Sequence, residues 1–420
     1  MKNSSQKPEV MAPVGSFAAL SGAIKAGANS VYFGVQQLNM RARSAANFTL
    51  DDLREIADTC NEAEVRTYLT VNTVLYDHDL TLMRAIIDTA KEANVTAIIA
   101  QDMAAIQYAN KIGMTVHIST QLSISNFESM KFYAQFADTV VLAREVDLDS
   151  IAAICKKIKD EDLRGPAGEL VKIEIFVHGA LCIAQSGRCQ MSLLQSNTSA
   201  QRGACLHECR KMYRVHDEET GHELRVGGPY IFSPKDLCAL PFLDKLVKAG
   251  ISVFKIEGRG RSPQYVDTVV RVYREAVEAI SAGTFNKKKV DAWMERLKSV
   301  YNRGFCEGYY MGKPLPEWSG YSGNRSTDER IFVGKVNHYF PKAKVAELAI
   351  QAHKFAKGDR LVFIGKTTGV LHVTVDSIER EHKSIKETKR SDLVTIPVPD
   401  RVRLSDKVFL LKKRNLDELD

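Results

Sequence analysis

The sequence predicts an α/β protein, built as a (β/α)8 TIM-like barrel with a cysteine-rich insertion and a small C-terminal antiparallel β-barrel domain. Three observations support this. Apolar strand-like runs alternate with helical patterns over most of the 420 residues. Five of the eight cysteines fall between Cys182 and Cys238. After Ile331 the pattern changes to short β-runs separated by turns.

The barrel elements follow one another in regular order. Helices are expected over Ser16–Ala26, over Thr49–Ala63 with Thr49 as N-cap, and from Ser262 to about Ala282 with proline in the first turn. Eight such βα units suggest a closed barrel more readily than an open sheet, and a ninth strand candidate at Tyr230–Pro234 places an insertion in the final crossover. The eight strands are expected at Glu9–Pro13, Ser30–Gly34, Arg66–Asn72, Ala97–Gln101, Thr115–Thr120, Thr139–Ala143, Lys172–Val177 and Ser252–Glu257.

The pattern divides the chain into a barrel domain over residues 8–310, which carries the cysteine loop 182–238, a linker over 311–327 and a C-terminal domain over 328–415. The linker contains a Gly/Ser-rich stretch, and the short β-runs beyond it are typical of a small antiparallel barrel. They are expected at Ile331–Val336, Lys344–Ala349, Arg360–Ile364, Leu371–Val375, Leu393–Ile396 and Lys407–Leu411.

Charge is distributed unevenly along the chain. The net charge is +7, and the residues from Arg325 onward hold 20 Lys/Arg against 14 Asp/Glu. A basic module on a nearly neutral body indicates an anionic partner, RNA before membrane, although a solvated surface would also explain the excess. The polar N-terminus and the absence of a long apolar run predict a cytoplasmic protein without membrane contact.

The clustered cysteines are the strongest chemical feature. In a reducing compartment such a cluster points to metal ligation or redox chemistry more often than to disulfides. Cys205 and Cys209 have the spacing of half a zinc site, whereas the longer gap between Cys182 and Cys189 suits an iron–sulfur cluster. Spacing alone leaves both metals open, and with Cys238 there are five candidates for four places.

Polar groups gather where the predicted strands end, which is where such barrels place their active sites. Proton-transfer candidates are His117, Asp102, Glu145 and His178, although the carboxylates could equally cap helices and His117 could be a hydrogen-bonded barrel residue. Anion-binding candidates are Arg259, Arg261, Arg144 and Lys255. Arg259 and Arg261 precede the last barrel helix among glycines, where this fold usually binds a phosphate or carboxylate. Lys255 could face either the barrel interior or the pocket.

Two stretches resemble hydrolytic motifs but are incomplete. The run that starts at His207-Glu208 begins like H-E-x-x-H but ends in lysine. Gly320-Tyr-Ser-Gly-Asn324 lacks the last glycine of G-x-S-x-G. No protease machinery is therefore visible in these motifs.

Several ordered motifs nevertheless resemble the collagenase-like peptidase family of unassigned catalytic type (U-type). They cover roughly residues 8–310. The leading one is Glu174-x-Phe-x-x-Gly-Ala-Leu-Cys-x6-Cys189-x-Met-Ser192, and it is accompanied by Ala12-Pro-x-Gly, Arg202-Gly-x-Cys-x3-Cys-Arg210, Ser233-Pro-Lys-Asp-Leu and Lys255-Ile-Glu-Gly-Arg259.

The resemblance implies a [4Fe–4S] enzyme that hydroxylates RNA without molecular oxygen. It implies Cys182, Cys189 and Cys205 as ligands, with Cys209 favoured over Cys238 as the fourth. The expected reaction is 5-hydroxylation of the tRNA wobble uridine with prephenate, a small anion, as hydroxyl source, and a second family member is a possible partner chain. The alternatives are 23S rRNA cytidine hydroxylation, a metal-dependent peptidase, and a non-enzymatic RNA-binding module with structural zinc.

Overall fold

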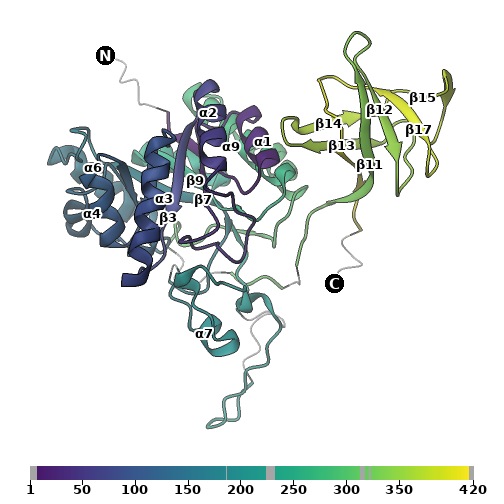
Figure 1. Cartoon of the computed structure of the whole chain (residues 1–420). Coiled ribbons are helices and arrows are strands. Elements are labelled where there is room, and N and C mark those ends of the chain that lie inside the picture. Colours follow the sequence, from purple (N-terminus) through teal and green to yellow (C-terminus); the bar gives the residue numbers. More distant parts are fainter. Residues whose placement is uncertain (1–6, 186, 224–231, 313–316, 321–322, 416–420) are drawn as a thin grey trace.

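The protein, described by a computed structural model, has two domains, each built on its own β-sheet (Figure 1). The structure describes residues 7–185, 187–223, 232–312, 317–320 and 323–415. In the first sheet seven consecutive parallel strands and β9 close into a ring, because β9 pairs with both β1 and β7. The predicted barrel is therefore confirmed. Its strands are β1 Glu9–Pro13, β2 Ser30–Phe33, β3 Arg66–Val71, β4 Ala97–Ala100, β5 Thr115–Ile118, β6 Thr139–Val141, β7 Lys172–Ala180 and β9 Val253–Ile256.

Amphipathic helices cover the outside of the barrel, and their apolar faces pack on the strands in one large core. Ser262 caps the longest helix, α9, by accepting a hydrogen bond from the Tyr265 amide, with proline in the first turn as predicted. The prediction of Thr49 as an N-cap was wrong: α2 begins at Asp52, whose carboxylate accepts from the Thr49 amide and hydroxyl. The helices are α1 Phe17–Lys25, α2 Asp52–Glu62, α3 Leu80–Glu92, α4 Met103–Lys111, α5 Phe127–Tyr133, α6 Leu148–Asp160, α8 Leu243–Ala249, α9 Pro263–Ser281 and α10 Lys287–Lys298.

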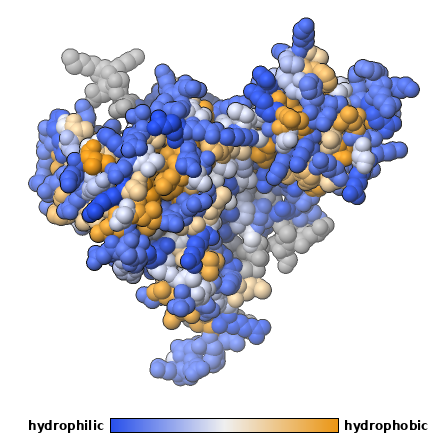
Figure 2. All heavy atoms as spheres, in the orientation of Figure 1, coloured by the Kyte–Doolittle hydropathy of each residue, from blue (hydrophilic) through white to orange (hydrophobic). Residues whose placement is uncertain are grey.

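The cysteine-rich insertion follows β7 and carries α7 (Gln190–Ser196). It extends below the barrel in Figure 1, and hydrophilic residues cover its tip in Figure 2. The insertion returns through β8 (Asp236–Cys238), which pairs antiparallel with the end of β7. The ninth strand was predicted a few residues too early, because Phe232–Pro234 forms a turn and a single bridge; Tyr230 and Ile231 lie outside the described residues.

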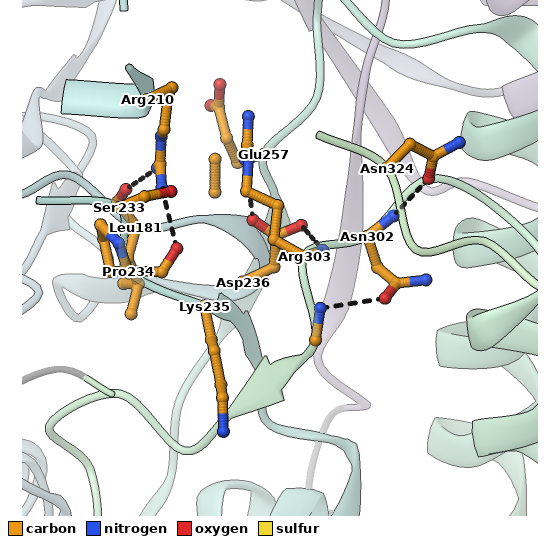
Figure 3. Close-up of polar contacts among 12 residues, drawn as sticks. Leu181, Arg210, Ser233, Pro234, Lys235, Asp236, Glu257, Asn302, Arg303 and Asn324 are labelled. Carbon is orange, nitrogen blue, oxygen red and sulfur yellow. Dashed lines mark hydrogen bonds and ion pairs between the residues drawn. The ribbon is translucent and has the colours of Figure 1, made fainter. Parts of the chain in front are cut away.

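Residues after α10 also pair with this insertion. The two-residue strand β10 (Phe305–Cys306) pairs with β8, and Pro234 forms a β-bridge with Trp318. Arg303 donates to the Asp236 carboxylate at 3.1 Å (Figure 3). The segment before the second sheet is thus attached to the strand that closes the cysteine insertion.

The C-terminal domain is one antiparallel sheet of eight strands in the order β14-β13-β18-β11-β12-β17-β15-β16. All of its longer strands contribute to one apolar core, so the sheet wraps around that core as a barrel would. The short β15–β16 hairpin was not predicted. The strands are β11 Asp328–Phe340, β12 Val345–Ile350, β13 Arg360–Gly365, β14 Gly369–Thr374, β15 Ile378–Arg380, β16 Lys383–Ile385, β17 Leu393–Pro397 and β18 Lys407–Lys413.

This domain packs on the barrel through the β13–β14 hairpin, which lies on α1 (Figure 1). Gly369, at φ +66°, is so close that an added Cβ would lie 2.8 Å from the Gly22 backbone nitrogen. The Ser21 hydroxyl donates to the Lys366 carbonyl at 2.6 Å, and the Lys25 ammonium donates to the Thr368 carbonyl at 3.0 Å. Among the described residues, no helix has the length and apolarity needed to cross a membrane.

Candidate functional site

A cavity of about 400 Å³ opens at the carboxyl ends of the barrel strands, between the barrel and the cysteine insertion. Cationic side chains outnumber acidic ones in its lining, in which the acidic members are Glu208 and Glu257. Such a cavity favours anionic ligands. The cations are Arg41, Arg144, Arg210, Lys255, Arg259, Arg261 and Arg303.

Four of the five clustered cysteines line this cavity: Cys182, Cys189, Cys205 and Cys209. Burial raises the pKa of Cys209 to about 11, and the neighbouring thiolates of Cys182, Cys205 and Cys189 also raise it. The four thiols, which come from loops on both sides of α7, are therefore close enough to interact electrostatically. Thiols bind a metal as thiolates, because the metal displaces their protons, so thiols that share a cavity are candidate metal ligands.

Cys238 lies elsewhere. It is on β8, 2% exposed, with its thiol 3.9 Å from the Tyr273 hydroxyl and 3.7 Å from the Met294 sulfur. Burial raises its pKa to about 12. Of the two candidates for a fourth ligand, Cys209 is the one that shares the cavity with the other three.

Arg210 holds two cysteine loops together (Figure 3). Its guanidinium donates to the Leu181 carbonyl at 2.6 Å, next to Cys182, and to the Pro234 carbonyl at 2.8 Å. Its Nε is buried and has no hydrogen-bond partner within the described part of the chain. An unpartnered donor beside Cys209 fits an acceptor that the protein itself does not supply, such as the sulfur of a bound cluster.

The thiols are not gathered around one point. Within the described ranges, no three His, Cys, Asp or Glu side chains are arranged to hold a single metal ion. Zinc would require its thiolate sulfurs about 2.3 Å from one centre. A cluster of several irons is larger and takes one thiolate at each iron, often from separate loops. Four cysteine thiols are a donor set that both kinds of centre use.

The three arginines predicted to bind anions line the cavity, but they differ in how many of their N–H donors the protein already uses. Arg259 is 5% exposed and donates to Thr70 Oγ1 at 2.7 Å and Asn39 Oδ1 at 2.5 Å, and burial lowers its pKa to about 10. Arg261 stacks on the Tyr301 ring at 3.5 Å. Arg144 lies 3.9 Å from the centre of the Phe176 ring and donates to the Ala180 carbonyl. Arg261 and Arg144 keep more donors for a ligand.

Lys255 and His117 meet on one buried carboxylate. Glu174 is 0% exposed; its Oε1 accepts from the Lys255 ammonium at 2.6 Å, and its Oε2 lies 3.0 Å from His117 Nδ1. Burial alone would raise the pKa of Glu174, but Lys255 and then His117 outweigh this effect and lower it to about 2. Lys255 lines the cavity, whereas His117 is not among the residues that line it.

The other three proton-transfer candidates lie away from the cavity lining. His178 is 1% exposed, near the Tyr273 hydroxyl, and burial lowers its pKa to about 3. The Asp102 carboxylate accepts from the Ala104 amide and caps α4, the structural role weighed from the sequence. Glu145 is exposed.

Three cationic residues of the cavity were missed from the sequence. Arg41, in the loop after β2, donates to Glu257 Oε1 at 2.9 Å and lies 3.1 Å from His207 Nε2. Arg303 comes from the segment after α10. Arg210 directly follows a cysteine, which was an available indication, whereas nothing in the sequence around Arg41 or Arg303 pointed to the cavity.

The sequence profile described as Peptidase family U32 matches residues 15–320. The chain belongs to peptidase family U32. The match covers the barrel from α1 onward, the cysteine insertion and the segment that pairs with it, and the first strand β1 lies just before it. The resemblance read from the motifs is thereby confirmed.

Relatives in family U32 carry two kinds of name. A protein named "Collagenase" from Porphyromonas gingivalis is 50% identical over 97% of this chain and 98% of its own length. "tRNA hydroxylation protein P1" from Bacillus subtilis is 30% identical over 96% of this chain and 93% of its own. "tRNA hydroxylation protein P" from Escherichia coli is 27% identical, with 97% of both chains covered.

Among solved structures, "The Structure of the U32 Peptidase Mk0906" is similar at 10% identity, with a TM-score of 0.38 over 61% of this chain and 95% of that one. The C-terminal domain of a putative U32 peptidase from Geobacillus thermoleovorans is similar at 20% identity over 20% of this chain and 92% of its own, with a TM-score of 0.18.

Proposed function

We propose that this U32 protein is an iron–sulfur-dependent, oxygen-independent RNA hydroxylase that modifies tRNA, most specifically the wobble uridine at C5, with prephenate as the hydroxyl source. The observation that carries the proposal is the shared cavity of Cys182, Cys189, Cys205 and Cys209 amid seven cationic side chains. Relatives named for tRNA hydroxylation align along nearly the whole chain.

The four cavity cysteines would hold a [4Fe–4S] cluster, which supplies one-electron transfer when bound. Arg210 would fix two ligand loops, because it donates to the carbonyl beside Cys182 while following Cys209 in sequence. Its unpartnered Nε–H would donate to cluster sulfur, a contact that tunes the reduction potential.

The cationic lining would bind the donor and the RNA backbone. A dicarboxylate such as prephenate carries two negative charges, and guanidinium groups recognise carboxylates through paired hydrogen bonds. The basic C-terminal domain would contact phosphates further along the RNA, and its 20 Lys/Arg against 14 Asp/Glu from Arg325 onward support this role.

A collagenase-like peptidase is the second candidate, favoured by the name of the relative that is 50% identical. In the cavity, however, His207 lies against Arg41, and burial together with this guanidinium lowers its pKa to about 4. Such a histidine is a poor general base near neutral pH. Gelatin degradation by the purified protein would support the peptidase.

The decisive experiment is nucleoside mass spectrometry of RNA from a deletion strain, complemented with the wild-type gene or the Cys205→Ser variant. The proposal expects hydroxylated uridine to disappear on deletion and to return with the wild-type gene alone. Loss of a hydroxylated cytidine from 23S rRNA would redirect the reaction to that RNA. Unchanged nucleosides in tRNA and rRNA would refute it. Anaerobically purified protein should absorb broadly near ~400 nm.

A further inference from the structure

Lys255 stands out among the cavity residues because its charge is deeply buried and yet borders the cavity. The residue is 4% exposed. Its ammonium lies 4.5 Å from the centre of the Tyr32 ring and 5.5 Å from that of Phe176. An ammonium has three N–H donors, and the Glu174 carboxylate takes one of them at 2.6 Å.

Stability alone gives little reason for this arrangement. A buried lysine–carboxylate pair often stabilises a fold no more than an apolar pair of the same size, because both charges lose their hydration. This pair sits on the neighbouring strands β7 and β9, and its lysine lines the cavity. The placement therefore points to a ligand that uses the charge.

A second cation shares the same aromatic ring. Arg144 lies 3.9 Å from the centre of Phe176 and also lines the cavity. Its Nε is buried and, within the described residues, lacks a hydrogen-bond partner. Lys255 and Arg144 thus place two positive groups around one buried aromatic ring at the cavity, and such a pair suits a small compound with two carboxylates.

We propose that Lys255 and Arg144 each bind one carboxylate of a cyclic dicarboxylate co-substrate, and that Glu174 and His117 are positioning residues for the Lys255 ammonium. This inference rests on the proposed function for the identity of the ligand. The Glu174 carboxylate is held in place when the ligand binds, because its second oxygen lies 3.0 Å from His117 Nδ1. His117 therefore acts through Glu174 and does not touch the ligand.

The test measures ligand binding directly, by calorimetry on the purified, cluster-containing protein. The probes are prephenate, with two carboxylates, and phenylpyruvate, with one. Because Lys255→Met alone would leave the buried Glu174 charge without its lysine partner, the main variant is the double Lys255→Met/Glu174→Gln. Asp267→Asn is the matched control, since it neutralises a buried carboxylate paired with Arg271 on the outer helix α9.

The wild type should prefer prephenate over phenylpyruvate. The double variant and Arg144→Met should each lose about 10- to 100-fold in prephenate affinity, the size of one charge-assisted hydrogen bond. Phenylpyruvate affinity should change little in whichever of the two removes the partner of the carboxylate that phenylpyruvate lacks. The control should bind both as the wild type does. Equal prephenate affinity in the folded double variant and the wild type would overturn the inference, as would a wild type that does not bind prephenate.

His117 gives a readout that a purely structural role would not move. His117→Ala should raise the KM for prephenate while kcat at saturating prephenate stays within about threefold, and His117→Gln, which can still donate to Glu174, should restore the KM. A wild type that binds prephenate with this selectivity but hydroxylates no RNA would refute the proposed function and leave this inference standing.

Discussion

Arg210 offers a sharp test of how the cysteine loops are held. Replacing it with methionine keeps much of its volume but removes three hydrogen bonds: to Leu181 O at 2.6 Å, Pro234 O at 2.8 Å and Ser233 Oγ at 2.9 Å. Hydrogen bonds from a charged donor contribute about 1.5–3 kcal/mol each, and partial rehydration of the freed acceptors recovers part of this. We expect the loops to lose about 3 kcal/mol of local stability.

The assay is amide hydrogen exchange of the segments around Leu181 and Pro234, together with iron content after anaerobic purification. About 3 kcal/mol corresponds to roughly 100-fold faster exchange through local opening. The matched control is Arg188→Met, which removes an exposed arginine beside Cys189. If Arg210→Met keeps wild-type exchange and iron content, Arg210 does not hold the cysteine loops together.

Three further predictions follow from the same geometry. Cys209→Ser should lose most of the bound iron and Cys238→Ser should retain it, measured by iron and sulfide analysis; the reverse result would move the fourth ligand to β8. The pKa of Glu257 is lowered from 4.5 to about 2, because neighbouring arginines outweigh its burial. The contribution of Glu257 to the free energy of unfolding is therefore full above about pH 4.5 and is lost as the pH falls toward 2, a decline of up to ~3 kcal/mol. Urea unfolding across this pH range should show the decline, and the Glu257→Gln variant should lack it. Gly369→Ala should weaken domain docking by about 1–3 kcal/mol and expose the linker to proteolysis, whereas Gly358→Ala, at φ +92° with nothing within 4 Å, should only strain its turn.

The barrel was predictable because its strands are apolar runs with helical patterns between them, and strand order follows chain order all the way to β7. The strand β8 was placed too early, since Asp236–Cys238 is only three residues long and is defined by pairing with β7. Such short strands depend on tertiary contacts that local sequence does not report.

The cysteines that share the cavity could be read from clustering, but the roles of the other residues could not. Asp102 and His178 stand at strand ends just as Lys255 does, yet one caps a helix and the other is buried against Tyr273. Side-chain direction at the end of a strand decides between these outcomes, and the sequence carries no direct record of it. Arg41 came from a loop without any pattern.

The pairing of β10 with β8 sets a practical limit on how this protein can be divided. The segment that holds Arg303, β10 and Trp318 lies after the last barrel helix, but it is bound to Asp236 and Pro234 of the cysteine insertion. A truncated protein that stops directly after α10 would leave the closing strand of the insertion without its neighbour. A self-sufficient fragment should instead extend to about residue 320, where the family match also ends.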